Sequence, residues 1–404
     1  MLVLKICPDF LKHANKFIDK KINITGTNGK TTTSGIVSHL LKKKNLRIIN
    51  NAKGANMLTG VVNAISISLN PFVKSDFSVI ESDEAYLSKI YDKFDADYLL
   101  VTNLFRDQLD RYGELAKTKA LIQEAIDKKS ALKLILNADD PLVSSFDGKN
   151  KVFYGIENIF YADGNEPPKS LTEEAFNCPC GKPLNYSKKF YAQQGHYFCE
   201  CGYRRPDVKY KADVTIYRSY LEIKLDGTVY KVPLVGVFNA YNALGAIALL
   251  KECGIKDIET DLTDFQVAFG RSEVKSLNHK KTLIQLIKNP IGANEVLKTV
   301  DLDSNILIII NDNYADGRDV SWLWDAEFEV INKASREITV SGTRALDMAL
   351  RLKYAGVENI KVISDIDSAV DYVSKTADND ITILPTYTAL LKINKNKKFK
   401  RCEV

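Results

Sequence analysis

The chain of 404 residues carries 56 basic and 51 acidic side chains, 45% hydrophobic residues and a formal net charge of +5. This length allows two or three domains of roughly 150 residues each, the composition excludes a disordered chain, and the small charge does not favour nucleic-acid binding. No window of about 18 residues is uninterruptedly apolar, and the first residues do not form a secretion signal, so we expect no transmembrane segment and a cytoplasmic protein.

The first long segment alternates short β-rich runs with runs of helix length. The predicted strands are Lys21–Thr25, Phe77–Ile80, Tyr98–Thr102 and Leu132–Leu136. Helices are predicted from the turn after the first strand to about Lys43, and over about Leu115–Lys128. Because strands and helices alternate, we predict a parallel sheet with helices on both faces.

The alternation breaks between about Phe160 and Asp213. This stretch contains five prolines and four clustered cysteines, and it is too long for a plain loop. We therefore predict an inserted module. Strand patterns resume at Val214–Ile223 and Thr228–Pro233, and a helix is predicted over about Ala240–Glu252.

A last α/β unit is predicted after about Gly270. Its predicted elements are strands at Asn305–Ile310, Ile338–Val340, Lys361–Ile363 and Ile381–Leu384, and a helix over about Ala345–Tyr354. The basic tail Lys392–Arg401 is expected to be a frayed, solvated terminus. The alternative is that this tail lies near anionic lipid headgroups.

A glycine-bearing loop follows the first predicted strand and opens a helix; its residues are Gly26, Thr27, Asn28, Gly29, Lys30, Thr31 and Thr32. Glycines let backbone N–H groups close around phosphate oxygens, and the helix N-terminus adds partial positive charge. We predict that Lys30 reaches the β- and γ-phosphates and that the Thr31 hydroxyl binds Mg²⁺. The usual phosphate loop has four residues between its first glycine and Gly-Lys, and this one has two. The alternative is a glycine turn with a lysine by chance.

Acidic residues follow two later strands. Glu81 ends the run FSVIE, and Asn103–Asp110 follows the next strand. A carboxylate at a strand end can hold Mg²⁺, and open α/β sheets bind ligands beyond the carboxyl ends of their strands. Taken alone, each site is more commonly a solvated acidic loop.

Six segments together resemble the Mur ligase family in order and spacing. They are GTNGKTT, the strand-end glutamate, TNLFRDQLD, LNADDP, GVFNAYNALGA and FGRSE. The resemblance implies a central ATPase domain over residues 1–270, in which ATP activates a carboxylate as an acyl phosphate that an amine then attacks. It implies Mg²⁺ at Thr31 and Glu81. Beyond the loop it implies nucleotide contacts at Asn137, Asp140, Asn239, Asn242 and Arg271, the last at the hinge into the final domain.

Several positions depart from the Mur pattern. Only about 25 residues precede the loop, too few for the family's UDP-gripping domain, so we do not expect a UDP-linked peptide as substrate. Gln108 stands where the family has a metal-binding histidine, and Phe238 where a histidine usually precedes the asparagine. A carbamylated lysine has no counterpart beyond Lys119. The second magnesium site therefore stays open.

Two Cys-x-Cys-Gly knuckles lie 18 residues apart, formed by Cys178, Cys180, Cys199 and Cys201. Four thiolates in a tetrahedron suit Zn²⁺ and leave no open position for catalysis, so we predict a structural zinc ribbon over about residues 174–207. The alternatives are four free thiols, a ligand role for His196, and nucleic-acid binding through Arg204, Arg205 and Lys209. For these three basic residues a solvated face is the simpler interpretation.

An acidic loop at residues 311–325, NDNYADGRDVSWLWD, contains both tryptophans of the chain. By itself it is either a catalytic element at a strand end or a turn whose tryptophans cap the core. Together with the Mur-type core, the cysteine insert, SGTRALDMALRL and PTYTALL, it resembles the MurT family, the ligase subunits of bacterial lipid II isoglutaminyl synthase. The likeness spans nearly the whole chain.

The MurT resemblance implies a heterodimer with a GatD-type glutamine amidotransferase, formed through a smaller α/β domain over residues 271–404. It implies membrane-borne lipid II as substrate, met at the inner face of the cell membrane, with ammonia converting an activated D-glutamate α-carboxylate to D-isoglutamine. It also implies an aspartate that completes the partner's Cys-His-Asp triad. We expect Asp316 in this role, with Asp319 and Asp325 as alternatives.

Two other functions stay open. One is an amino-acid-adding ligase of the Mur or folylpolyglutamate type. The other is a non-catalytic ATP-binding scaffold with a zinc-ribbon interaction module, which Gln108 and Phe238 favour. The missing UDP-binding domain and the acidic loop favour amidation over amino-acid addition.

Overall fold

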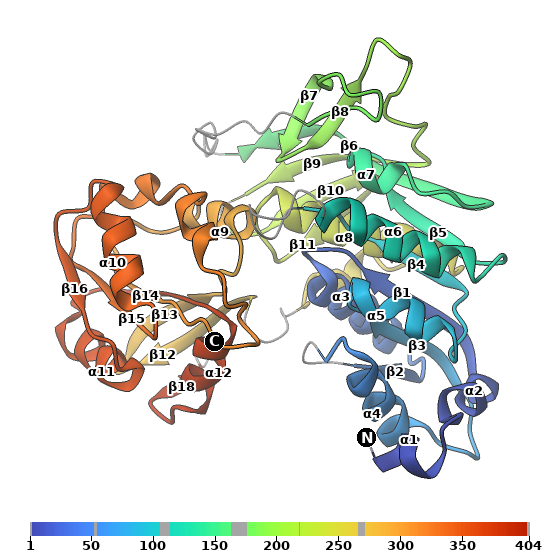
Figure 1. Ribbon diagram of the computed structural model, residues 1–404, viewed down its shortest axis with the longest axis horizontal. Coiled ribbons are helices and arrows are strands. Elements are labelled where there is room, and N and C mark those ends of the chain that lie inside the picture. The colour runs from blue at the N-terminus through green and yellow to red at the C-terminus, as the bar shows by residue number, and fades with distance from the viewer. Residues whose placement is uncertain are drawn as a thin grey trace. The chain divides into compact units, whose positions relative to one another are not determined.

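The computed structural model describes residues 2–51, 55–105, 114–162, 176–217, 219–265 and 271–401. The described chain forms two compact units (Figure 1). We call the part up to residue 265 the N-terminal unit and the part from residue 271 the C-terminal unit. Each is built on one large sheet, and a small hairpin stands outside the sheet of the N-terminal unit.

The sheet of the N-terminal unit has the strand order β11-β10-β9-β6-β5-β4-β1-β3-β2. Its strands are β1 Ile18–Thr25, β2 Ile48–Asn50, β3 Ser75–Glu81, β4 Tyr98–Val101, β5 Lys133–Asn137, β6 Asn150–Tyr161, β9 Tyr210–Ile216, β10 Leu221–Leu225 and β11 Thr228–Val232. All neighbours from β2 to β9 pair in parallel, and β9, β10 and β11 pair antiparallel. The predicted parallel sheet is therefore confirmed, with an antiparallel extension at one edge.

Helices cover both faces of this sheet. The helices are α1 Leu2–Ile6, α2 Phe10–Ala14, α3 Lys30–Lys43, α4 Leu58–Ser68, α5 Glu84–Tyr91, α6 Glu114–Asp127, α7 Pro141–Ser144 and α8 Val237–Glu252. On one face, α4, α5 and α6 enclose an apolar core that includes Val61, Ile90 and Ile122. On the other face, α3 and α8 pack together. Helix α8 is apolar nearly all round because it is buried on nearly all sides.

The insert leaves the sheet between β6 and β9, two strands that pair directly. Its strands β7 (Asn185–Tyr191) and β8 (Gln194–Phe198) form an antiparallel hairpin of their own. The prediction of one strand over Val214–Ile223 was wrong. The chain turns there between β9 and β10, where the rings of Tyr217 and Tyr220 stack at 4.3 Å.

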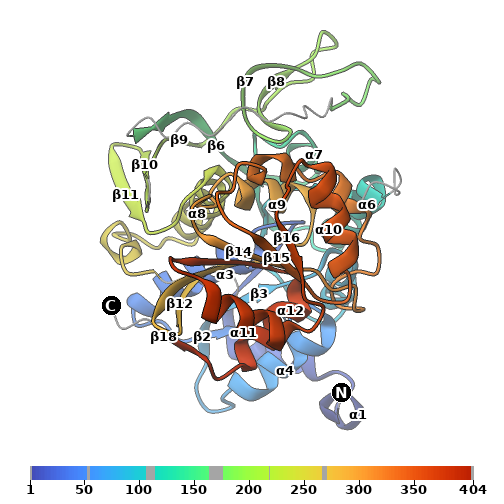
Figure 2. The ribbon, with the colours of Figure 1, turned by 90° about the vertical axis from the view of Figure 1, so that its left-hand side faces the viewer.

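The C-terminal unit has a sheet with the order β16-β15-β14-β17-β13-β12-β18. Its strands are β12 Arg271–Leu277, β13 Lys280–Gln285, β14 Asn305–Ile309, β15 Ile338–Ser341, β16 Ile360–Val362, β17 Ile381–Pro385 and β18 Phe399–Arg401. Its helices are α9 Pro290–Leu297, α10 Ala345–Tyr354, α11 Ile366–Thr376 and α12 Tyr387–Lys395. Helices α9 and α10 cover one face, and α11 and α12 the other (Figure 2).

The basic tail is not frayed. Helix α12 ends at Lys395, and β18 then pairs antiparallel with β12, with Phe399 opposite Leu277. The prediction of a solvated terminus was wrong because the apolar Phe399 packs against the core beneath α11 and α12. The basic side chains of residues 392–401 thus lie on the end of α12, on an edge strand and in the turn between them.

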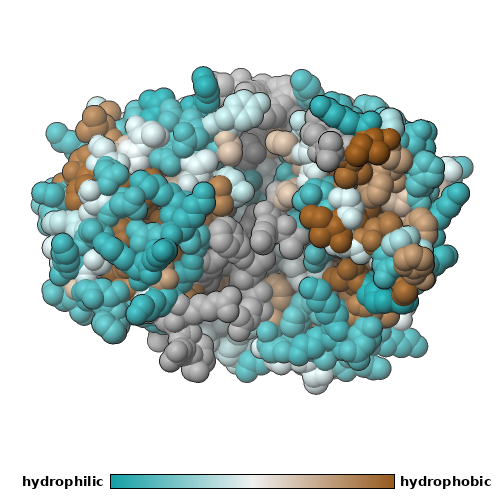
Figure 3. All heavy atoms as spheres, turned by 90° about the horizontal axis from the view of Figure 1, so that it is seen from below, coloured by the Kyte–Doolittle hydropathy of each residue, from teal (hydrophilic) through white to brown (hydrophobic). Residues whose placement is uncertain are grey.

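A few large apolar side chains of the N-terminal unit stay exposed, among them Ile6, Ile67 and Phe72. Figure 3 shows apolar side chains interspersed with hydrophilic ones on the face seen there. Exposed apolar side chains of this kind are ordinary on a folded protein. No helix among the described residues combines the length and apolar character that crossing a membrane requires.

Glu252, at the end of α8, ties this helix to β5 and β9. Its carboxylate accepts from Lys133 Nζ at 2.9 Å, Lys209 Nζ at 2.5 Å and Tyr210 OH at 2.7 Å. Burial alone opposes ionisation, but these donors outweigh it and lower the pKa of Glu252 from 4.5 to about 2. Because the folded-state pKa is the lower one, the carboxylate stabilises the fold above about pH 4.5, and this stabilisation is lost as the pH falls toward 2.

We expect Glu252→Gln to lower the free energy of unfolding by about 2 kcal/mol at pH 7, with the difference shrinking steadily below pH 4.5. Urea unfolding at pH 7 and pH 3 measures this. Glu222→Gln is the control, because within the described part of the chain its carboxylate accepts a single side-chain hydrogen bond, from the Tyr217 hydroxyl at 3.4 Å. An equal loss at both pH values would show that the ionised carboxylate is not the stabilising group.

Candidate active site

The loop between β1 and α3 contains two glycines in the left-handed region. Gly26 has φ +126° and Gly29 has φ +86°. A Cβ atom on Gly26 would lie 2.2 Å from Thr102 Oγ1, and one on Gly29 would lie 2.0 Å from Asn242 Oδ1. Both positions therefore require glycine, because the loop is packed against the end of β4 on one side and α8 on the other.

Asn103, just after β4, holds the loop in shape. Its Oδ1 accepts from the Asn28 N–H at 2.9 Å, and its Nδ2 donates to the Asn28 carbonyl at 3.0 Å. Its own carbonyl accepts from the Thr27 N–H at 2.9 Å. The loop is thus fixed before any ligand binds, with the first turn of α3 directly behind it. Such a helix N-terminus favours phosphate oxygens.

Lys30 begins α3, and its side chain folds back over the loop. Its Nζ donates to the Gly26 carbonyl at 2.5 Å and to Glu84 Oε1 at 2.9 Å. Burial lowers the pKa of Lys30, but three neighbouring carboxylates, Glu84 first among them, outweigh burial and raise it above its usual value. Lys30 is therefore a buried cation beside the loop. Sequence reasoning missed Glu84, which lies three residues after Glu81 at the start of α5.

Thr31 and Glu81 come together as the sequence predicts for a magnesium site. Thr31 Oγ1 donates to Glu81 Oε1 at 3.0 Å. Two oxygens on adjacent corners of a Mg²⁺ octahedron lie about 2.9 Å apart, so this pair fits the ion. Asn51 fixes Glu81 from both sides, since its Oδ1 accepts from the Glu81 N–H at 2.8 Å and its Nδ2 donates to the Glu81 carbonyl at 2.7 Å.

Asn137 and Asp140, at the end of β5, are both fully buried and bonded within the protein. Asn137 Oδ1 accepts from the Asp139 N–H at 3.0 Å. Asp140 caps α7 and also accepts from the Leu104 N–H at 3.1 Å and from Gln193 Nε2 at 3.3 Å. Burial raises the pKa of Asp140 to about 6. Their predicted nucleotide contacts stay a prediction, and both residues also shape the strand-end loops.

Asn239 and Asn242 lie in the first two turns of α8. Asn239 Nδ2 donates to the Val235 carbonyl at 2.8 Å, and Asn242 Nδ2 donates to Asn239 Oδ1 at 3.3 Å. Because Asn242 also lies against Gly29, the two asparagines are next to the glycine loop between β1 and α3, which is called the phosphate loop below.

Two predicted positions lie outside what the structure describes. Arg271 begins β12, but its side chain is not among the described residues, and neither is Gln108. Lys119, the weak candidate for a carbamylated lysine, lies on α6. Burial lowers the pKa of its ammonium group, and the charge of Asp147 opposes this effect. The second magnesium site therefore stays open.

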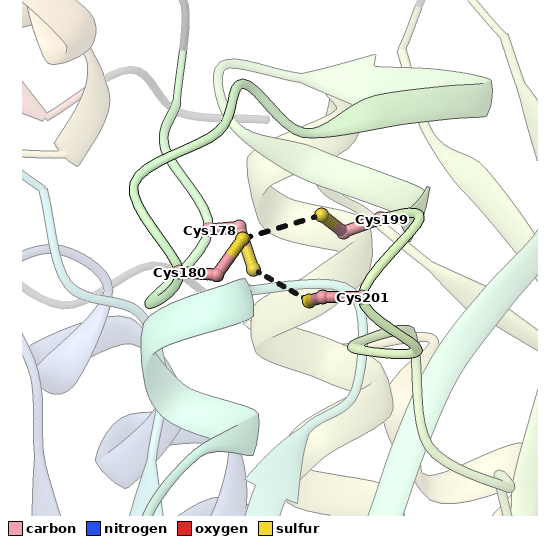
Figure 4. A group of neighbouring side chains, drawn as sticks. All are labelled: Cys178, Cys180, Cys199 and Cys201. Atoms are coloured by element: carbon pink, nitrogen blue, oxygen red, sulfur yellow. Dashed lines mark hydrogen bonds between the residues drawn. The ribbon is translucent and has the colours of Figure 1, made fainter.

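The four cysteines of the insert converge (Figure 4). Their sulfur atoms all lie within 4.8 Å of one another, with 3.4 Å between Cys178 and Cys201 and 3.7 Å between Cys180 and Cys199. Four thiolates around one Zn²⁺ are about 3.8 Å apart, so the set fits a tetrahedral zinc site. His196 is not part of this group, because its Nε2 lies 2.8 Å from the Ile156 carbonyl.

Of the three basic residues of the insert, Arg204 and Lys209 are exposed, whereas Arg205 is not. Arg205 is largely buried and pairs with Asp139 at 2.6 Å and with Glu157 at 2.7 Å. Lys209 pairs with Glu252. The interpretation of this group as a solvated basic face was wrong for Arg205, and two of the three charges are neutralised within the protein.

We expect the wild-type chain to bind one zinc ion, and we expect Cys201→Ser to abolish this binding and to lower the melting temperature, because an ion held by all four thiolates would crosslink both knuckles. Metal analysis of the purified protein and thermal unfolding measure the two effects. Cys7→Ser is the matched control, because Cys7 lies outside the cluster. Zinc retained at full stoichiometry by Cys201→Ser would contradict the four-thiolate site.

Three motifs of the C-terminal unit meet at the carboxyl ends of β14, β15 and β17. Asp312, after β14, accepts from Thr343 Oγ1 at 2.8 Å and from Arg344 Nε at 2.8 Å. Asp316 Oδ1 accepts from the Thr388 N–H at 2.7 Å, and its other oxygen accepts from the Thr388 hydroxyl at 2.5 Å. The acidic loop, SGTRALDMALRL and PTYTALL are therefore one local structure, and Asp316 is half-buried against the start of α12.

The two tryptophans of the acidic loop behave differently. Trp322 is buried in the core, whereas Trp324 is 50% exposed and packs edge to face on Tyr354 of α10 at 5.4 Å. The interpretation that both tryptophans cap the core is thus correct for Trp322 only. Tyr314, two residues before Asp316, is 89% exposed. The acidic loop therefore exposes two aromatic side chains to solvent, Tyr314 and Trp324.

Comparison with known proteins identifies the family of the chain. The family model for the Mur ligase middle domain matches residues 24–176, and the model for the MurT ligase C-terminal domain matches residues 286–390. The lipid II isoglutaminyl synthase (glutamine-hydrolyzing) subunit MurT of Staphylococcus aureus (strain COL) is 38% identical over 398 residues, covering 96% of this chain and 89% of that protein. The chain belongs to the MurT family.

Two further comparisons agree with the MurT assignment. The subunit of the same name from Streptococcus pneumoniae (strain ATCC BAA-255 / R6) is 34% identical over 91% of this chain and 85% of its own length. A pseudomurein peptide ligase type C from Methanothermus fervidus superposes with a TM-score of 0.73 at 24% identity, over 93% of this chain and 78% of that one. The latter likeness shows the Mur ligase fold, and the MurT relatives show the family.

Proposed function

We propose that this MurT-family chain is the ATP-dependent ligase subunit of a lipid II isoglutaminyl synthase, and that it amidates the D-glutamate α-carboxylate of the lipid II stem peptide. One arrangement supports this most directly. The glycine loop presents a helix N-terminus and the buried cation Lys30, and the Thr31–Glu81 pair lies beside them with the spacing of magnesium ligands. Magnesium-bound ATP supplies the γ-phosphoryl group at such a site.

In the proposed reaction, an oxygen of the substrate carboxylate forms a bond to the γ-phosphorus of ATP, and ADP leaves. Ammonia then attacks the carbonyl carbon of the acyl phosphate, inorganic phosphate leaves with that oxygen, and the nitrogen loses a proton to give the amide. Lys30 binds the β- and γ-phosphates and neutralises charge that builds up on them. Thr31 and Glu81 hold Mg²⁺, and Asn239 and Asn242 contact the nucleotide beside Gly29.

Lys30 must change partners for this to happen. In the structure it is paired with Glu84, whose side chain is 15% exposed. A triphosphate brings more negative charge and more acceptor oxygens than one carboxylate, so it competes well for the same ammonium group. Glu84 thus keeps Lys30 charged and near the loop until the nucleotide arrives.

The ammonia source is proposed to be a GatD-type glutamine amidotransferase bound as a heterodimer. The relatives are named as subunits of a glutamine-hydrolysing synthase, which supports a partner. Asp316 is proposed to orient the partner's catalytic histidine. It lies next to the exposed Tyr314, and Thr388 holds its carboxylate in place. We also propose that the complex works at the inner face of the cell membrane, where lipid II is presented.

Amino-acid addition by a Mur-type mechanism is the second candidate, because the Mur ligase fold supports it equally. One assay separates the two. The chain is incubated with lipid II, ATP and Mg²⁺, with either ammonium or a mixture of amino acids as the nitrogen source. We expect an amide product, one ADP per amide, only in the ammonium arm. Amino-acid addition without amide formation would overturn the proposal.

A further inference from the structure

Asp139 joins three parts of the N-terminal unit. This carboxylate is fully buried and lies between the two predicted nucleotide contacts Asn137 and Asp140. Its Oδ1 accepts from Arg205 Nε at 2.6 Å, and its Oδ2 accepts from the Ile156 N–H at 2.8 Å and from the Tyr241 hydroxyl at 2.8 Å. The contact of Asp139 with Arg205 and Tyr241 is called the Asp139 junction below.

Arg205 brings the cysteine insert into this junction. Arg205 lies four residues after Cys201, and its backbone N–H donates to the Tyr197 carbonyl at 3.0 Å. Tyr197 belongs to the small apolar cluster that also contains Cys178 and Cys199. The approach to Asp139 is close enough to require glycine beside it. A Cβ atom on Gly155 would lie 2.7 Å from Arg205 Nη2 and 2.7 Å from Asp139 Oδ1.

Tyr241 carries the junction into α8. It lies between Asn239 and Asn242 on that helix, and Asn242 in turn lies against Gly29 of the phosphate loop. Because a helix turns as a rigid body, fixing the Tyr241 hydroxyl also fixes how the two asparagines face the loop. A continuous set of buried, directional contacts therefore runs from the insert to the nucleotide-binding residues.

A second contact runs from the same insert to the same motif. Gln193, in the turn between β7 and β8, donates to the Leu104 carbonyl at 2.8 Å and to Asp140 Oδ2 at 3.3 Å. The backbone of the neighbouring Gly195 donates to the Asp139 carbonyl at 2.9 Å. The insert thus forms hydrogen bonds with both aspartates of the LNADDP motif. Its exposed ion pair Lys182–Glu200 contacts neither aspartate.

We propose that Arg205 is a positioning residue for the nucleotide site, and that the cysteine insert sets nucleotide affinity through the Asp139 junction. This inference rests on the proposed function, because it assumes that the Gly26–Thr32 loop binds a nucleotide. Arg205 touches no phosphate itself. It acts through Asp139 and Tyr241 on the asparagines of α8, which is a coupling between two parts of one unit.

The test measures binding of the Mg²⁺ complex of a β,γ-imido ATP analogue by isothermal titration calorimetry on the full chain. We expect Arg205→Met to weaken the affinity about tenfold, which is typical of coupling between sites. We expect Tyr241→Phe to weaken the affinity for the analogue by a similar factor. We expect the double variant Arg205→Met/Tyr241→Phe to bind no more weakly than either single variant, because both residues act through the carboxylate of Asp139. Lys182→Met, which breaks the distant pair of the insert, is the matched control.

Kinetics give a second readout. Arg205→Met should raise the KM for ATP about tenfold while kcat at saturating ATP changes less than twofold, whereas general unfolding would lower kcat. In Arg205→Met/Asp139→Asn, one amide oxygen can still accept from Tyr241 and Ile156, and position 139 no longer carries a buried charge. The other partner of Arg205, Glu157, is 32% exposed and can be solvated, so affinity should recover to within about threefold of wild type.

Three results overturn the inference: an affinity of Arg205→Met within twofold of wild type, additive losses in the Tyr241 double variant, or an equal loss in Lys182→Met. If Arg205→Met fails to fold, Gly155→Ala replaces it, because its added methyl group pushes on the same contact. An unchanged affinity for folded Gly155→Ala would then overturn the inference. Failure of the wild-type chain to bind the analogue would instead overturn the proposed function.

Discussion

Replacing Lys30 with methionine is expected to lower the rate of ATP-dependent amidation by about 10²–10³-fold. Lys30 is a buried cation beside the phosphate loop, and removing one preorganised donor from a site of developing negative charge costs about this much. Methionine fills a similar volume without the charge. Amide formation from lipid II with ammonium as nitrogen source measures the effect, so that the result does not depend on glutamine hydrolysis by the proposed partner.

The control is Glu84→Gln. It removes the partner that holds Lys30 in the structure but leaves the ammonium group, so we expect amidation within about tenfold of wild type. Because Lys30→Met leaves the Glu84 carboxylate without this partner, thermal unfolding should accompany the assay. A folded Lys30→Met protein that amidates at the wild-type rate would favour the non-catalytic scaffold over the ligase.

Replacing Asp316 with asparagine is expected to separate the two sources of ammonia. Glutamine-driven amidation should fall by about 10³–10⁴-fold, because an asparagine in place of a triad aspartate does not hold the histidine in the correct tautomer. Amidation with added ammonium should stay within about twofold of wild type. Asparagine can still accept from the Thr388 N–H, so the start of α12 should keep its shape.

Asp319→Asn is the matched variant for this experiment. It lies in the same loop, and its Oδ1 accepts from the Ser321 N–H at 2.8 Å, so it serves the local turn. If Asp319→Asn loses glutamine-driven activity and Asp316→Asn does not, the triad role belongs to Asp319. Loss of both activities in Asp316→Asn would place this residue in the ligase reaction.

The sequence predicted that Thr31, from the glycine-loop motif, and Glu81, from its place at a strand end, hold the same ion. Glu81 ends β3 and Thr31 lies in the first turn of α3, after the loop that follows β1; because β1 and β3 are parallel neighbours, the two residues meet at one edge of the sheet. The two Cys-x-Cys-Gly knuckles also predicted one four-cysteine cluster, with four free thiols as the alternative, and the structure brings all four sulfur atoms together. Local sequence patterns were enough to predict which side chains meet where the contact follows from motif spacing and regular secondary structure.

Contacts that depend on the path of the insert could not be predicted. Arg205 and Asp139 are 66 residues apart in sequence, and nothing in the basic run around Arg205 distinguishes a buried ion pair from a solvated face. The pairing of Lys30 with Glu84 was missed for a different reason, because no helix was predicted at Glu84, although Asp83 before it is a typical N-cap residue and does cap α5. Side-chain partners across elements are set by packing, which a single sequence does not show.

The edge formed by β12 and β18 bears on how the protein is made. The first strand of the C-terminal unit, β12, pairs with β18 at residues 399–401. During synthesis on the ribosome, β18 therefore emerges on the order of ten seconds after β12. All strands of the N-terminal unit have emerged by residue 232 and can fold during that interval. Meanwhile β12 can pair with β13 on one side, but its other edge stays open to pairing with other nascent chains, which favours aggregation at this stage of biosynthesis.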